Sequence, residues 1–239
     1  MDTFNIQYRF TMSDGSRELF DLNIDARTLN MIVDIPDNPP FWTKIDYYQC
    51  PRCPFTKNEK SLCPLSVNLV EVVKRFGRII SFEKLHVDVL TSERLYSKDT
   101  TAHEGLSSMM GLIIACSECP FTDFFKPMAR FHLPFAGYEE TIFRAISTYL
   151  LSLYFKNSKN GLYDYEMTGL SEIYQSIEEL NLAVSKRLRA ASQKDSTVNA
   201  LIHLDVFAKF MTFPVEYNLE KIGYLFDPFL QNRKQRQQA

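Results

Sequence analysis

The sequence predicts an α+β fold, in which an N-terminal antiparallel sheet packs against a C-terminal helical half. Segments that alternate apolar and polar side chains, as strands do, fall within residues 1–100. Apolar residues at helical spacing dominate the rest of the chain. We therefore predict a mainly β part at 1–100, a helical part at 101–230 and a frayed polar tail at 231–239. One integrated domain formed by the first two parts is the alternative.

The first predicted element is a β-hairpin. Residues 4–10 alternate apolar and polar side chains, which predicts a strand with one buried face. The pair Asp14-Gly15 favours a hairpin turn, and the alternation resumes over residues 20–24. Further extended segments are predicted at 32–35, 42–48, 85–89 and 94–100.

Helical spacing predicts one helix at 65–76 within the β part, ended by Gly77. The pattern at 138–155 is apolar on most sides, which predicts a central buried helix. Three neighbouring basic residues at 186–189 indicate a solvated face of another helix. The remaining helices are predicted at 102–115, 121–131, 173–188, 197–210 and 215–230. Close helix packing explains a stripe of small residues in the first of these, at Gly105, Ser108, Gly111 and Ala115.

Composition excludes several classes of protein. The 239 residues are 45% hydrophobic and 23% charged, values typical of a globular protein. The net charge of −2 gives no basic field for nucleic acid, and no apolar run is long enough to span a bilayer. The start of the sequence has no basic segment followed by an apolar run, so we expect a cytoplasmic protein. A protein partner or a homo-oligomer stays open.

The cysteines are the sharpest functional signal. Four of the five are followed directly by proline, which biases the residue before it toward extended backbone and stiffens a loop. These pairs begin at Cys50, Cys53, Cys63 and Cys119, whereas Cys116 precedes serine. Two Cys-x-x-Cys spacings result, and each lets a tight turn present two sulfurs to one ion. In a reducing compartment such cysteines indicate metal binding or catalysis before disulfides.

A tetrahedral metal site needs four such ligands. Cys50, Cys53, Cys116 and Cys119 make one four-thiolate set. In the alternative set, Cys63 joins Cys50, Cys53 and one member of the second pair. We predict zinc ahead of an iron–sulfur cluster, because the compact spacing of bacterial clusters is absent. The competing interpretation is that the thiols are inert, since free cysteine behaves as a small hydrophobe.

A second candidate site surrounds His132. Arg130, His132 and Glu140 lie close in sequence, and the histidine is a candidate general base or extra metal ligand. A structural explanation competes with this, because Glu140 lies in the first turn of a helix and can pair with Arg144 four residues on. His86 and His203 have no ligand-like companion nearby in the sequence.

Several segments resemble an uncharacterised family of bacterial cytoplasmic proteins, a domain of unknown function with paired Cys-Pro motifs. They are Tyr48-Gln49-Cys50-Pro51-Arg52-Cys53-Pro54 and the segments 63–65, 111–120, 128–135 and 139–141. The resemblance covers most of the chain. It implies a bacterial protein with an N-terminal sheet and a helical C-terminal part, and it carries over no functional residue.

Three functions follow from these observations. The first is a structural or sensing module built on a metal–cysteine site. The second is a redox or hydrolytic enzyme that uses this site with His132, and the third is an interaction protein with inert thiols. Metal analysis separates the third from the other two, whereas the sequence alone leaves open whether the protein is an enzyme.

Overall fold

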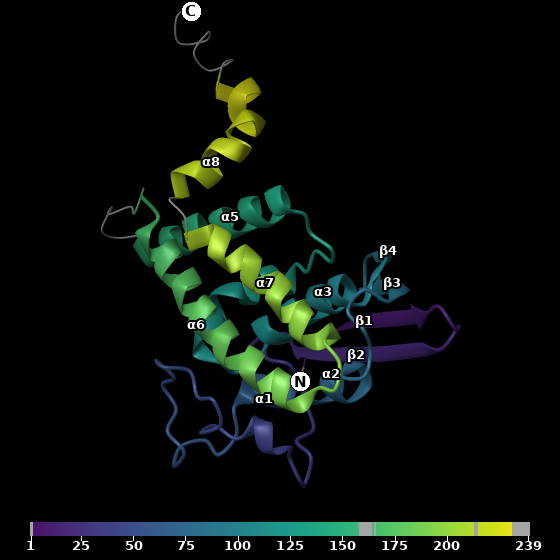
Figure 1. Ribbon diagram of the computed structural model, residues 1–239. Helices are drawn as coiled ribbons and strands as arrows, with labels where there is room; N and C mark the ends of the chain where they lie inside the picture. The colour runs from purple at the N-terminus through teal and green to yellow at the C-terminus, as the bar shows by residue number, and fades with distance from the viewer. Residues whose placement is uncertain (1, 158–163, 165, 213–214, 231–239) are drawn as a thin grey trace, which may run out of the picture.

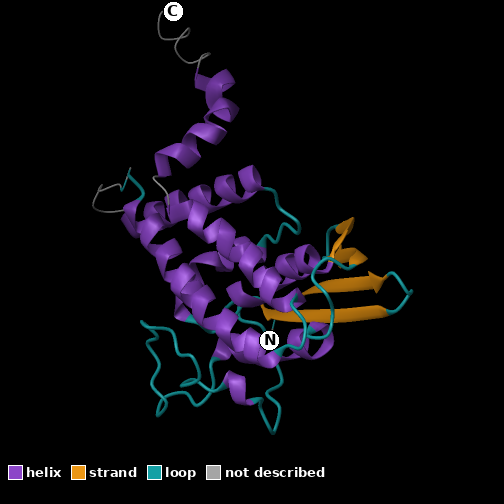
Figure 2. Ribbon diagram, in the orientation of Figure 1, coloured by secondary structure: helices purple, strands orange, loops and turns teal. Residues whose placement is uncertain are grey.

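The computed structural model describes residues 2–157, 164, 166–212 and 215–230. As predicted, it is an α+β fold, with strands near the N-terminus and helices over most of the rest (Figure 2). The predicted tail at 231–239 lies outside the described residues. The division into parts at residue 100 stays a prediction.

Four antiparallel strands form one sheet in the order β2-β1-β3-β4. Alternation buries every second side chain of the central strands, while the other face carries polar cross-strand pairs such as Gln7 with Asp21. The first hairpin is confirmed, with Tyr8 opposite Phe20. The strands are β1 (Thr3–Met12), β2 (Arg17–Asp25), β3 (Lys84–Leu90) and β4 (Leu95–Thr101).

Helices cover the apolar face of the sheet and extend away from it (Figure 1). The helix predicted at 65–76 is divided in two, because Leu69 ends one helix and precedes the next. The α-helices are α1 (Pro64–Asn68), α2 (Val70–Phe76), α3 (Ala102–Ala115), α4 (Lys126–Arg130), α5 (Tyr138–Asn157), α6 (Thr168–Ala191), α7 (Ser196–Thr212) and α8 (Val215–Gly223). Short 3₁₀ helices are η1 (Phe41–Thr43), η2 (Pro120–Phe125) and η3 (Tyr224–Phe226).

The larger core cluster joins the sheet to the helices. It contains Phe10 of β1, Phe76 of α2, Met109 of α3 and Leu188 of α6. A second cluster is built by α5, the first half of α6, and parts of α7 and α8. Helix α3 is the central element, since most of its side chains are buried between the sheet and α7.

The prediction of a central buried helix at 138–155 is wrong. In α5, Ile142 and Ile146 are buried, but Leu151 and Phe155 are 56% and 71% exposed. This helix carries more apolar residues than its one packed face can bury. The predicted strand at 32–35 is also wrong, and the first two residues of the segment predicted as extended at 42–48 belong to η1 instead.

Candidate functional site

The segment that carries the first cysteines is a long connection from η1 to α1, at the lower left of Figure 1. Arg187 of α6 fixes its start, because Nη1 donates to the carbonyl oxygens of Trp42 and Lys44, both at 2.8 Å. Nη2 donates to the carbonyl oxygen of Ile45 at 3.1 Å. The prediction of a solvated basic face is wrong for Arg187, which is 2% exposed. Backbone carbonyls take the place of water around this buried charge.

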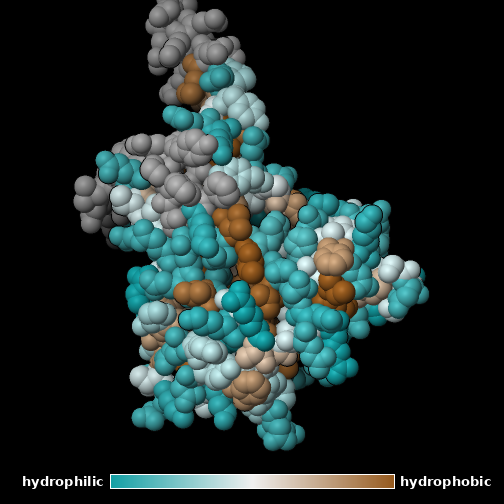
Figure 3. Space-filling model, viewed as in Figure 1, coloured by the Kyte–Doolittle hydropathy of each residue, from teal (hydrophilic) through white to brown (hydrophobic). Residues whose placement is uncertain are grey.

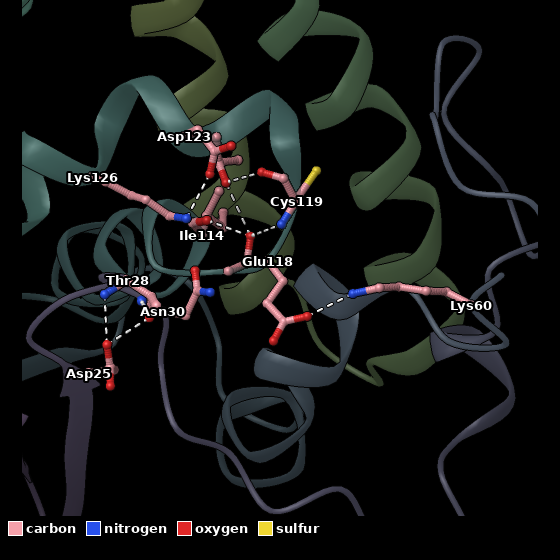
Figure 4. Close-up of polar contacts among 11 residues, drawn as sticks. Asp25, Thr28, Asn30, Lys60, Ile114, Glu118, Cys119, Asp123 and Lys126 are labelled. Atoms are coloured by element: carbon pink, nitrogen blue, oxygen red, sulfur yellow. Dashed lines mark hydrogen bonds and ion pairs between the residues drawn. The ribbon is translucent and has the colours of Figure 1, made fainter. Parts of the chain in front are cut away.

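Two ion pairs hold the rest of the connection. The guanidinium of Arg52 makes two 2.9 Å hydrogen bonds to the Glu179 carboxylate on α6. Lys60 Nζ lies 2.7 Å from Glu118 Oε2, and Figure 4 shows this contact beside Cys119. The second pair joins the connection to the segment between α3 and η2. It therefore brings the two cysteine-bearing regions of the sequence side by side.

Cys63 and Cys119 occupy equivalent positions in the two regions. Each has extended backbone and directly precedes the proline that begins a helix, α1 for Cys63 and η2 for Cys119. This is the conformation that a following proline favours. Cys50 and Cys53 lie in a tight turn, in which the Cys53 amide donates to the Cys50 carbonyl oxygen at 3.0 Å.

The thiols of the four Cys-Pro pairs are electrostatic neighbours. Burial, followed by the nearby thiols of Cys63 and Cys53, raises the pKa of the Cys50 thiol to about 11, against a lowering by Arg187. Burial is also the main cause that raises the pKa of Cys119 to about 12, with smaller contributions from Cys63, Cys50 and Cys53. Two regions distant in sequence thus contribute to one group of sulfur atoms, which we call the Cys-Pro cluster (Cys50, Cys53, Cys63 and Cys119).

Cys116 occupies a different environment. It is fully buried at the end of α3, and its carbonyl oxygen accepts a hydrogen bond from the Met31 amide at 2.7 Å. Burial raises the pKa of its thiol to about 12, and the charge that opposes this is Lys126, not another cysteine. Of the two ligand sets predicted from the sequence, the structure groups the one that contains Cys63.

The Cys-Pro cluster does not have coordination geometry in this structure. Among the described residues, no group of three or more His, Cys, Asp or Glu side chains is arranged to hold a metal ion. The sulfur atoms are therefore close enough to affect the ionisation of Cys50 and Cys119 but are not placed around a common centre.

The second candidate site does not converge. His132 Nε2 lies 2.6 Å from the Tyr8 hydroxyl, and Arg130 stacks on the ring of Phe4. Glu140 accepts a hydrogen bond from the Gly137 amide, the capping role considered for it above. Burial lowers the pKa of His132 to about 3, so its imidazole is neutral at physiological pH.

His86 has no companion nearby in the sequence, but the sheet brings polar partners to it. Its Nδ1 lies 2.6 Å from Asp99 Oδ1, and its Nε2 lies 2.8 Å from the Ser97 hydroxyl on the neighbouring strand. This spacing resembles a Ser-His-Asp triad, but Ser97 donates to Asp88 at 2.6 Å and its proton is not directed at the imidazole. The Asp99 hydrogen bond also raises the pKa of His86, which disfavours the neutral base. The pairing register of β3 and β4 could have predicted these contacts, since it places His86 opposite Asp99 and Asp88 opposite Ser97.

Sequence comparison identifies the family. The profile of a domain of unknown function, DUF6901, matches residues 6–227. The chain belongs to this family. No curated protein and no solved structure matches the chain. Within the part of the chain that the structure describes, no helix has the length and apolar character needed to cross a membrane.

Proposed function

We propose that this DUF6901 chain is a metal-binding module in which Cys50, Cys53, Cys63 and Cys119 hold one ion, with zinc as the first choice. The observation that carries the proposal is that the thiols of one connection, Cys50, Cys53 and Cys63, lie near enough to Cys119 of a distant segment to raise its pKa. Without a cation, burial and the neighbouring thiols make Cys50 and Cys119 hard to ionise. A bound cation reverses that effect, since it stabilises every thiolate around it.

The residues fit a thiolate-bound ion in chemical type. Four sulfur ligands suit zinc, and a closed set of four is typical of a structural site rather than a catalytic one. Four thiolates around a divalent cation leave net negative charge, which the buried guanidinium of Arg187 offsets in part. When bound, zinc would supply a cross-link between the η1–α1 connection and the start of η2.

Ligation requires the four sulfur atoms to move closer together. The segment that carries Cys50 and Cys53 contains turns but no helix or strand, so its movement breaks no regular secondary structure. Cys63 and Cys119 precede their helices and are already half-buried against the core. We therefore assign the adjustment to the Cys50–Cys53 turn.

Elemental analysis of protein purified without added metal tests the proposal. We expect about one zinc per chain, lost together with several degrees of melting temperature on chelation. Iron with a coloured preparation would instead indicate a cluster on the same thiolates. Protein that contains no metal, and that gains no stability when zinc is titrated in, would refute the site and favour inert thiols.

Two matched variants decide the ligand set. Cys63→Ser should lose the metal, whereas Cys116→Ala should retain it even if loss of a buried side chain lowers its stability. The opposite result would favour the set of Cys50, Cys53, Cys116 and Cys119. The enzyme alternative, in which His132 acts beside the metal, requires an open coordination position and lacks a contact between His132 and any cysteine among the described residues.

A further inference from the structure

A cavity of about 530 Å³ lies between α3, α6, α7 and the connection from α4 to α5. Its size is in the range of small-molecule sites. Most of its lining is apolar, and Phe125 in its wall packs against both core clusters. The cavity is therefore at the junction of the two cores, where neither fills the space. On the outer side, Val206 of its lining is 46% exposed, and Figure 3 shows hydrophobic surface along α7.

One charged group in the wall is incompletely paired. Arg144 of α5 donates from Nη2 to the carbonyl oxygens of Met128 and Phe131, at 2.6 and 3.0 Å, and so caps the end of α4. Its Nε and Nη1 donors have no partner among the described residues, and no carboxylate there forms an ion pair with it. Glu140 is within electrostatic reach, but its Oε2 accepts from Gly137.

A second donor beside it is also unpaired. Tyr174 of α6 lines the cavity, is 3% exposed and interacts electrostatically with Arg144. No hydrogen bond to its hydroxyl occurs within the described part of the chain, and this oxygen is not one of the fully buried unpaired atoms, so it keeps accessible surface beside the cavity that the residue lines. Arg144, with donors that the two carbonyl oxygens do not use, and the Tyr174 hydroxyl thus line one largely apolar space.

Most of the other polar groups of the lining are already engaged. The Glu104 carboxylate is bound by the Thr100 hydroxyl, and Lys98 lies over the ring of Phe135. His203 Nδ1 lies 3.1 Å from the Ser107 hydroxyl, and His132 contacts Tyr8. Arg144 and Tyr174 therefore offer protons to an anion, and so does the ammonium of Lys98, whose contact with the Phe135 ring leaves its hydrogen-bond donors without an acceptor among the described residues.

We propose that this cavity binds an apolar carboxylate, such as a medium-chain fatty acid, with the carboxylate at Arg144 and Tyr174 and the chain along α3 and α7. Arginine suits carboxylates because its planar N–H donors match the two oxygens. The site is separate from the Cys-Pro cluster and does not depend on a metal there.

Isothermal titration of the full chain with decanoate and with decanol tests the proposal. Decanoate should bind at least tenfold more tightly than decanol, because only decanoate supplies the acceptor for Arg144. Tyr174→Phe removes a hydroxyl that makes no hydrogen bond to a described residue, so it should leave the melting temperature unchanged and weaken decanoate binding about fivefold. Arg144→Gln should remove the preference for decanoate, while Arg130→Gln, at an exposed arginine outside the cavity, should not.

A cavity-filling variant provides a test that does not remove a polar contact. A Cβ atom at Gly111 would lie 3.5 Å from its nearest neighbour, Leu204 Cδ2, so the helix accepts a side chain there. Gly111→Leu should fold normally and lose binding of both compounds. Equal affinity for decanoate and decanol, no binding of either, or undiminished binding by Tyr174→Phe and Gly111→Leu would each overturn the proposal.

Discussion

The buried guanidinium of Arg187 lowers the pKa of the Cys50 thiol, while its donors hold the backbone at the start of the same connection. One side chain on α6 thus holds the start of the connection and also places a positive charge near Cys50, the first cysteine in it. No ion pair between Arg187 and a carboxylate occurs among the described residues. The positive charge of Arg187 is therefore not offset by a described carboxylate and can favour a nearby thiolate.

Replacing Arg187 should destabilise the protein strongly. Arg187→Met leaves the carbonyl oxygens of Trp42, Lys44 and Ile45 without their donors, at a cost of about 3 kcal/mol of unfolding free energy. Arg187→Lys keeps the charge but not the fork of donors, so it should recover only part of the loss. Urea unfolding measures both variants. Arg189→Met on the exposed face of the same helix is the control, and a loss as small as that of the control would contradict this role.

Alanine substitution should have opposite effects on stability at two glycines in the small-residue stripe of α3, Gly105 and Gly111. A Cβ atom at Gly105 would lie 2.9 Å from Val87 Cγ2 and 3.2 Å from Phe10 Cε1, because the helix rests there on the sheet. Gly105→Ala should therefore lower the unfolding free energy by about 1–2 kcal/mol. At Gly111 the added Cβ atom makes only an ordinary van der Waals contact with Leu204, and Gly111→Ala should raise the unfolding free energy by up to about 1 kcal/mol through helix propensity.

Thermal and urea unfolding of the two variants compare these positions directly. The stripe at 105–115 predicted close packing, but the sequence did not show that the packing partner at Gly105 is the sheet. If Gly105→Ala were as stable as Gly111→Ala, the close approach of α3 to β3 would be wrong.

The hairpin of β1 and β2 was predictable because its pattern is local. A period of two with one buried face fixes the register, and Asp14-Gly15 fixes the turn. The helices followed from the same kind of evidence, with boundaries shifted by a few residues. Burial of a whole helix was not predictable, and α5 shows why, since apolar side chains on several faces do not reveal which face finds a partner.

The site could be predicted only in outline. Proline after cysteine indicated the extended backbone found at Cys63 and Cys119. Which four thiols gather depends on how the η1–α1 connection passes α6 and η2, and the connection has no periodic pattern to reveal it. The burial of Arg187 was missed for a related reason. A charged residue within a basic run indicates a solvated surface until the backbone carbonyls that surround it are known.

His132 should make stability fall in acid. Burial is the main cause that lowers its pKa from 6.5 to about 3, with Arg144 adding repulsion, so the folded protein resists a proton that the unfolded chain accepts. The unfolded state therefore binds more protons between these values, and stability decreases as the pH falls from 6.5 toward 3. His132→Gln should reduce that slope by up to about 1.4 kcal/mol per pH unit in urea unfolding at pH 4–6. A slope unchanged by the substitution would count against the buried, neutral imidazole.

His86 should make stability fall as the pH rises, which is the opposite of the effect expected for His132. The hydrogen bond that its Nδ1–H donates to Asp99 is the main cause that raises the pKa of His86 above 6.5, and Asp88 adds to it. The folded state therefore holds the proton more firmly, so the stabilisation is complete below pH 6.5 and is lost as the pH rises through the raised pKa. His86→Gln should then lower the unfolding free energy at pH 5.5 but not at pH 9. The loss should stay below about 1 kcal/mol, because the pair is largely exposed to solvent. Asp99→Asn should reproduce it, and an equal loss at both pH values would show that packing, not charge, is the cause.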